Sequence, residues 1–276
     1  MTSKQAIVVP LYKTELTEPE LMSLERTLNV LAEHDLFIVG PERLQSYFVA
    51  LSKQYGERLR LQLFSDHFFE SIAGYNRLLV SEQFYARFTD YEYMLLVQTD
   101  ALVLKDELAL WCNKGYSYIG APMFKGFTTP VRPLTLFCVG NGGFSLRNIE
   151  DFLKVLRQPR LFKNKLMEDW PGGWISITYR YLIDYWSFSY KNTQLNIDVN
   201  EDVFWGLFVP AACSFFKVPP VDEAIAFAFE AEPEHLYCLN EQRLPFGCHA
   251  WQRYDQGFWD RMLTSDQLHH LPIKIK

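Results

Sequence analysis

The stretch Tyr93–Leu104, YMLLVQTDALVL, decides how the rest of the sequence is interpreted. Five of its first six residues are apolar, which is typical of a strand buried on both faces. Thr99 and Asp100 follow, and a second apolar run comes directly after them. A buried carboxylate without a partner is costly, so Asp100 is expected to have one. That partner is either a donor within the protein or a ligand.

The residues that precede this stretch predict alternating strands and helices. A capping box at Thr17–Glu20, TEPE, opens the first helix. Apolar patterns predict strands at residues 5–12, 36–41, 58–64 and from 93 onward, and helices at 17–31, 42–55 and 71–88. Four such alternations in the first hundred residues predict an α/β fold with a mostly parallel sheet and helices on both faces. Ligands of such sheets bind outside the carboxyl ends of the strands, which favours Asp100 as a site residue over a turn cap.

Composition and charge narrow the class of protein. The chain has 276 residues, 49% of them hydrophobic and 22% charged, as expected for a globular protein with a large core. Its net charge of −6 disfavours nucleic acid as a partner. We expect no signal peptide and no transmembrane segment. The five cysteines form no CxxC pair, which favours a reducing compartment over a disulfide framework or a zinc site.

Two motifs in the second half each have a structural and a functional interpretation. The segment GNGGF, with Asn141, Gly142 and Gly143, is either a tight turn in which glycine supplies positive φ or a place where the backbone approaches a ligand. Glu201 and Asp202 in NEDVFW suit the first turn of a helix capped by Asn200. One of these acids pointing into a cleft would instead act as a general base.

Three further motifs also have both a structural and a functional interpretation. His249 in FGCHAW is either a satisfied packed histidine or a metal ligand or acid–base group. Arg77 in GYNRLL either pairs with a nearby acid or binds phosphate. Trp170 and Trp174 flank a Pro-Gly-Gly segment and are either core residues or a platform that stacks on a sugar face. The P-loop, HExxH, GxSxG and EF-hand signatures are absent, and GNGGFS lacks dinucleotide-binding spacing.

The order of these segments resembles the GT-A class of nucleotide-sugar glycosyltransferases. It is more closely similar to a bacterial family of putative glycosyltransferases associated with surface polysaccharides. The segments that carry the resemblance are VVPLYKTELTEPE, the run from Ser71 to Leu104, YIGAPMF, VGNGGFSLRN, NEDVFW and LPFGCHAW. The resemblance implies a single GT-A domain, 1–276, with a donor half at 1–125 and an acceptor and catalytic half at 126–276.

The resemblance also implies a role for each candidate residue. QTD takes the place of the DxD motif that holds a divalent cation, Mn²⁺ or Mg²⁺, against the donor diphosphate, with Gln98 replacing the first acid and Asp100 retained. A late His, here His249, would share the metal, and Asp202 or its neighbour Glu201 would be catalytic, with Asp202 as the base. The donor-binding residues would be Pro10, Tyr12, Tyr75, Asn76, Arg77, Gln98, Thr99, Asp100, Asn141, Gly142 and Gly143, and the acceptor-binding residues Trp170 and Trp174.

We therefore expect a cytoplasmic glycosyltransferase that moves a sugar from a nucleotide-sugar donor to a hydroxyl of a glycan or lipid-linked glycan. Inversion at the anomeric carbon follows from the resemblance of NEDVFW to inverting enzymes. The alternatives are a retaining transferase on the same fold, a nucleotidyltransferase, and a non-catalytic protein that binds glycans or nucleotide sugars. Peripheral contact with a membrane is left open.

Overall fold

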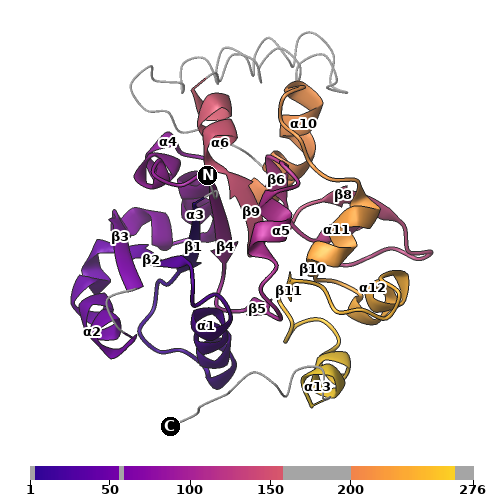
Figure 1. Ribbon diagram of the computed structural model, residues 1–276, viewed down its shortest axis with the longest axis horizontal. Helices are drawn as coiled ribbons and strands as arrows, with labels where there is room; N and C mark the ends of the chain where they lie inside the picture. Colours follow the sequence, from indigo (N-terminus) through magenta and orange to yellow (C-terminus); the bar gives the residue numbers. More distant parts are fainter. Residues whose placement is uncertain (1–3, 56–58, 158–199, 265–276) are drawn as a thin grey trace.

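The computed structural model describes residues 4–55, 59–157 and 200–264. Six described strands form the main sheet (Figure 1), in the order β3 (Leu59–Phe64), β2 (Asp35–Pro41), β1 (Gln5–Pro10), β4 (Tyr93–Val97), β9 (Phe144–Asn148) and β6 (Tyr118–Ile119). The first four strands in this order run parallel, and β9 is antiparallel to both of its neighbours. The predicted class, a mixed and mostly parallel sheet, is confirmed.

Helices cover both faces of this sheet, because successive residues of its central strands point to opposite sides. In β1, Ala6 and Val8 join one apolar cluster and Ile7 and Val9 join another. The second cluster is covered by α1 (Glu18–Val30), α2 (Gln45–Tyr55), which a 3-10 turn at Glu42–Leu44 precedes, and α5 (Leu108–Cys112). The first is covered by α3 (Ile72–Leu79), α4 (Glu82–Tyr85), α6 (Ile149–Leu156) and the helical segment from Glu201.

The helix predicted at residues 71–88 is broken in the structure, and that part of the prediction is wrong. The chain forms α3, then α4, then a 3-10 turn at Ala86–Phe88. Ser81 interrupts the helix because its hydroxyl donates to the carbonyl of Leu78 at 2.7 Å, a local bond that competes with the helical pattern. The carbonyl of Leu79 accepts instead from the Tyr85 hydroxyl at 2.9 Å and from the Trp205 indole at 3.2 Å. Because the Leu79 carbonyl is left free by this break, Trp205 can bond to it, and this bond connects the end of α3 to the segment that begins at Glu201.

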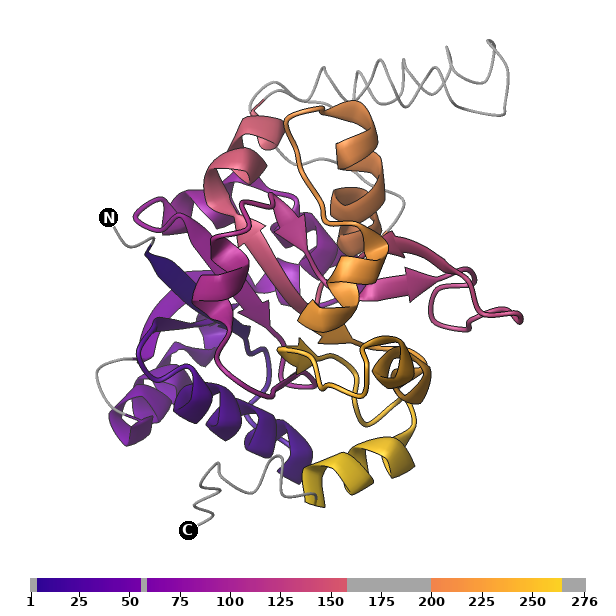
Figure 2. The same ribbon diagram turned by 45° about the vertical axis from the view of Figure 1, so that its right-hand side comes forward.

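The second half of the chain adds two smaller sheets. One contains β10 (Ala228–Phe229), β11 (Gly247–Cys248) and β5 (Leu102–Val103), and the other is the hairpin of β7 (Pro122–Phe124) and β8 (Leu136–Val139), which projects from the body in Figure 2. The remaining helical elements of the described residues are a 3-10 turn at Asp66–Phe69, α9 (Glu201–Val203), a π-helical turn at Phe204–Phe208, α10 (Val209–Ala212), α11 (Val221–Phe227), α12 (Pro233–Leu239) and α13 (Gln256–Thr264). Because β9 lies between β4 and β6, β11 pairs with β5, and β7 pairs with β8, the two expected halves share all three described sheets. The boundary at residue 125 stays a prediction.

The packing of the π-helical turn against β8 gives a test of the fold. A Cβ added at Gly206 would lie 1.8 Å from the carbonyl oxygen of Val139, which is backbone and cannot rotate away. Gly206→Ala should therefore destabilise the protein by about 1–3 kcal/mol through overpacking. Gly257→Ala in α13 is the matched control, because its new methyl group would have no neighbour closer than 3.7 Å. Urea denaturation measures both, and an unchanged Gly206→Ala midpoint would contradict the close packing.

Candidate active site

The predicted site residues converge on one cleft of about 520 Å³ at the carboxyl ends of β1 and β4. Of the predicted residues, the cleft is lined by Pro10, Tyr12, Tyr75, Asn76, Gln98, Thr99, Asp100, Gly142, Gly143, Glu201, Asp202 and His249. Glu20, Phe69, Glu70, Ser71, Ile72 and Asn200 also line it and were not predicted. These residues come from segments far apart in the sequence, and the sheet brings them together.

Two of the predicted donor residues, Arg77 and Asn141, do not line this cleft in the described structure. Arg77 is exposed and is not among the residues that line it, and the acid Asp66 pairs with Arg43 instead. Asn141 is buried beside the cleft rather than open to it. Trp170 and Trp174 lie outside the described residues, so the predicted acceptor platform stays a prediction.

Asp100 and His249 face each other in the cleft. Asp100 follows β4, His249 follows β11, and His249 Nε2 lies 3.3 Å from Asp100 Oδ1. That distance suits an ion pair, although Nε2 is buried and its alignment makes no hydrogen bond. The other ring nitrogen, Nδ1, lies 3.0 Å from Oε1 of Glu230.

The two carboxylates decide the charge of this histidine. Burial lowers the pKa of His249, but the contacts with Asp100 and Glu230 outweigh it and raise that pKa to about 10. Burial likewise opposes ionisation of Asp100, and the His249 contact holds the Asp100 pKa below its ordinary value. Without another cation in the cleft, the pair is therefore an imidazolium beside a carboxylate.

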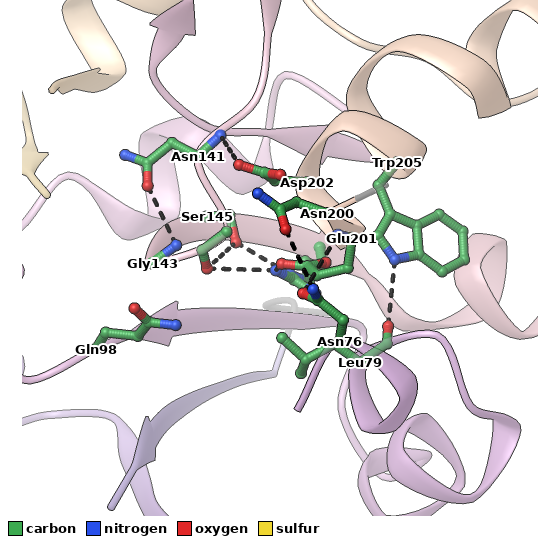
Figure 3. A network of polar contacts seen from close by, with 12 residues as sticks. Asn76, Leu79, Gln98, Asn141, Gly143, Ser145, Asn200, Glu201, Asp202 and Trp205 are labelled. Carbon is green, nitrogen blue, oxygen red and sulfur yellow. Dashed lines mark hydrogen bonds and ion pairs between the residues drawn. The ribbon is translucent and has the colours of Figure 1, made fainter. Parts of the chain in front are cut away.

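Asp202, which also lines the cleft, is held by backbone donors. Its Oδ2 accepts from the Asn141 amide at 3.2 Å and its Oδ1 from the Val203 amide at 2.8 Å (Figure 3). Burial raises the pKa of Asp202 and the charge of Glu230 raises it further, against these backbone bonds. A carboxylate with a raised pKa is a better proton acceptor than an ordinary aspartate near neutral pH.

Glu201, the neighbouring acid, has a different partner. Its Oε1 accepts from Arg147 at 2.9 Å, and the two side chains are 4% and 0% exposed. Arg147, which sequence reasoning did not select, also donates to the Tyr85 hydroxyl at 2.9 Å and to the Ser145 hydroxyl at 3.0 Å. This pairing favours a structural part for Glu201, although Glu201 Oε2 has no hydrogen-bond partner. The catalytic role of Glu201 stays a prediction.

The glycines of GNGGF are required for space rather than for positive φ. The residue with positive φ in this turn is Asn141, at 70°, whose side chain accepts from the Gly143 amide at 3.1 Å. A Cβ on Gly142 would lie 2.1 Å from Glu201 Oε1, and one on Gly143 would lie 2.1 Å from His249 Nε2. Neither glycine supplies positive φ, so that interpretation is wrong, and the close approach of the Glu201 and His249 side chains explains both glycines. The approach of a ligand to this backbone stays a prediction.

Asn200 begins α9, as predicted, but its side chain does not cap the helix. Its Oδ1 accepts from Asn76 Nδ2 at 3.3 Å instead, and the Glu201 amide donates to Asn76 Oδ1 at 3.4 Å. These contacts join α3 to α9 across the cleft floor (Figure 3). Gln98 lies opposite, with its amide donating to the Tyr75 hydroxyl at 3.4 Å.

Comparison with known proteins gives a family. Residues 58–249 match the family described as "Protein of unknown function (DUF5672)", which is more than two thirds of the chain. The chain belongs to this family. The matched residues include Asp100, Asp202 and His249, three candidate residues that line the cleft. No curated protein matches the sequence.

Several solved structures are similar to this DUF5672 chain at low sequence identity. Mouse xyloside xylosyltransferase 1 is 13% identical with a TM-score of 0.49, covering 89% of this chain and 97% of its own. The glycosyltransferase GlyE of Streptococcus pneumoniae TIGR4 is 12% identical with a TM-score of 0.45, and the match covers 96% of this chain and 61% of GlyE. The 4-diphosphocytidyl-2C-methyl-D-erythritol synthase of Anaerococcus prevotii is 11% identical with a TM-score of 0.35, covering 74% and 94%. Such distant overlays concern the fold, and the function has to be argued from the cleft.

No described helix combines the length and the apolar character needed to cross a bilayer. All five cysteines are free thiols. Placement in the cytoplasm stays a prediction.

The buried Arg147–Glu201 pair gives a test of the site's framework. Arg147→Met or Glu201→Leu should each destabilise the fold by about 3–5 kcal/mol, since each leaves a buried charge without its partner. The double variant should be more stable than either single variant, because it buries no charge. The exposed pair Arg157–Glu82 is the control, and Arg157→Met should cost less than about 1 kcal/mol. Urea denaturation measures all four, and equal losses at the two pairs would contradict the buried pair's role.

Proposed function

We propose that this protein is a GT-A glycosyltransferase that moves a sugar from a nucleotide-sugar donor to a hydroxyl of a glycan. The observation that carries the proposal is a cleft that contains two chemically different groups. Asp100 and His249 form a pair suited to a cation, and Asp202 is suited to removing a proton. A transferase of this type needs both, because its leaving group is a diphosphate and its nucleophile is a hydroxyl.

The charge of the cleft supports binding of the donor together with a divalent cation. Five of the described lining residues are carboxylates, and the sole basic one is His249. Lys13 pairs with Glu20 at 2.7 Å and Arg147 with Glu201 at 2.9 Å, which leaves Glu70, Asp100 and Asp202 as lining carboxylates without a lysine or arginine partner in the described structure. These three charges oppose the entry of a diphosphate that carries no cation. Mg²⁺ and Mn²⁺ are commonly held by one or two carboxylates together with substrate phosphates and water, so few protein ligands are needed.

The pair of Asp100 and His249 fits such an ion. His249 Nε2 is a buried nitrogen without a hydrogen-bond partner, and it lies beside a carboxylate oxygen. Nδ1 is already engaged by Glu230, as is usual for a metal-binding histidine. No group of three or more His, Cys, Asp or Glu side chains is arranged as a complete metal cage in the parts of the chain that the structure describes. Asp100 and His249 would therefore hold the ion, which when bound supplies positive charge to the departing diphosphate.

Asp202 serves as the general base in this proposal. A hydroxyl is a poor nucleophile until its proton is removed during attack, and a carboxylate within reach can accept that proton. Direct attack by the acceptor hydroxyl breaks the bond between the sugar and the diphosphate in one displacement and inverts the anomeric carbon. The family resemblance extends the proposal to glycan or lipid-linked acceptors of bacterial surface polysaccharides in the cytoplasm.

Removal of the metal-binding carboxylate tests the donor site. Asp100→Asn should abolish transfer and donor-dependent thermal stabilisation while the fold survives, and EDTA should stop the wild-type reaction until Mn²⁺ or Mg²⁺ is added. Asp106→Asn is the matched control, since Asp106 also pairs with a histidine, His34, at 3.1 Å but away from the cleft. Release of nucleoside diphosphate from UDP-, GDP- and dTDP-sugars, and of CMP from CMP-sugars, measures the activity. Full turnover by Asp100→Asn, or after exhaustive chelation, would exclude this donor site.

Removal of the base tests the activation of the acceptor. Asp202→Asn should lower kcat by about 10²–10⁴-fold and leave donor affinity nearly unchanged. Because the Asp202 pKa is raised and only its ionised form accepts a proton, wild-type kcat should fall on acidification at a higher pH than an ordinary aspartate, with a pKa of about 4, would give. The control is Asp222→Asn, an exposed acid in the first turn of α11.

The stereochemistry of the product separates this proposal from its rivals. NMR should show an anomeric configuration opposite to that of the donor. Retained configuration would point to the retaining alternative, and donor binding without any turnover would point to a non-catalytic protein. Near-normal turnover by Asp202→Asn would leave Asp202 as an acid that only anchors the turn at Asn141.

A further inference from the structure

Glu230 is a carboxylate beside the cleft that sequence reasoning did not select. It directly follows β10, as His249 directly follows β11, and these two strands are parallel neighbours with Phe229 opposite Cys248. The His249 amide donates to the Phe229 carbonyl at 3.0 Å, which continues the pairing by one residue. Glu230 and His249 are therefore placed side by side by the backbone, and Glu230 Oε1 lies 3.0 Å from His249 Nδ1.

This contact restricts which nitrogen of His249 the cleft can use. Nδ1 is taken by Glu230, so Nε2 is the nitrogen directed toward Asp100 Oδ1, 3.3 Å away. Gly143 closes the other side of the ring, since a Cβ there would lie 2.1 Å from Nε2. The imidazole is thus held by a carboxylate at Nδ1 and by the Gly143 backbone along the edge that includes Cδ2, and Nε2 is without a hydrogen-bond partner beside Asp100.

The surface pair of His34 and Asp106 shows what is special about this arrangement. There, one carboxylate meets one histidine nitrogen at 3.1 Å, and the Asp106 side chain is 38% exposed. His249 instead has a carboxylate at each nitrogen, and the Glu230 side chain is 16% exposed. A second carboxylate is not needed to hold a histidine in place. It is the feature expected where one nitrogen must be kept available for a ligand.

We propose that Glu230 is a positioning residue that orients His249 so that Nε2 and Asp100 together present one nitrogen and one carboxylate oxygen to a divalent cation. This inference rests on the cation site of the proposed function. Glu230 itself does not touch the cation or the donor. Its role is to accept a hydrogen bond from Nδ1–H of His249, which fixes Nε2 as the nitrogen that faces the cleft.

Titration with Mn²⁺ followed by EPR tests this role without any turnover. Glu230→Met keeps much of the side-chain volume but cannot accept from Nδ1, so it should weaken Mn²⁺ binding by about 10–100-fold. Glu230→Gln should restore most of the affinity, because its amide oxygen can accept the same hydrogen bond. Glu234→Gln is the matched control, since Glu234 pairs with Arg261 on the surface and should bind Mn²⁺ as wild type does. Asp100→Asn should lose binding.

The outcomes separate this inference from the proposed function. If wild-type protein binds Mn²⁺ and Glu230→Met binds it equally well, the positioning role is overturned and the cation site stands. If Glu230→Met and Glu230→Gln lose the same Mn²⁺ affinity, the orienting role is also overturned, because the loss would then come from removing the negative charge of Glu230 and not from removing the hydrogen bond to Nδ1. If wild-type protein does not bind Mn²⁺, the cation site of the proposed function falls together with this inference. Glu230→Ala replaces Glu230→Met should the latter fail to fold, with the same expected loss.

Discussion

The buried ion pair between Arg147 and Glu201 is the interaction on which the cleft depends. It joins β9, a central strand of the sheet, to the first residue of α9, and the same guanidinium reaches Tyr85 in α4. Two desolvated charges are costly, so the pair is tolerated because further hydrogen bonds surround it. Its effect is to fix the start of α9, and with it Asp202, against the turn at Asn141.

The sequence predicts the parts of this arrangement that depend on local pattern. Strands β1 to β4 follow from short apolar runs with clear ends, and Asp100 follows from its place after β4. Arg147 could not be recognised, because in the strand FSLRN it has the appearance of an outward polar residue and its partner is 54 positions away. Glu230 lies in an acidic stretch typical of a surface, and only the pairing of β10 with β11 brings it to His249. The break after α3 was missed for a similar reason, since the Tyr85 and Trp205 donors that accompany it come from tertiary packing.

The glycine turn explains how two unlike chemical groups can share one narrow cleft. Glu201 and His249 approach the turn at adjacent positions, and a side chain at either glycine would collide with one of them. The backbone of these two glycines therefore separates the acids at the start of α9 from the imidazole, although both line the same cleft. The glycines of GNGGF are required by this packing. The sequence marked the segment as unusual, but the reason proposed from the sequence, positive φ at glycine, was not the correct one.

The charge of the cleft gives a physical reason why QTD has Gln98 where a DxD motif has its first acid. The described lining already contains five carboxylates, of which Glu20 and Glu201 are paired with Lys13 and Arg147. A further acid at residue 98 would add to the negative charge of the other three. Gln98 instead offers a neutral amide that donates to Tyr75, while its backbone amide donates to the Gly143 carbonyl at 2.8 Å. In the proposed cation site, Asp100 is then the carboxylate of QTD that would bind the ion. The orientation of His249 would matter more there than in a site with two acids, because the histidine would supply the second ligand.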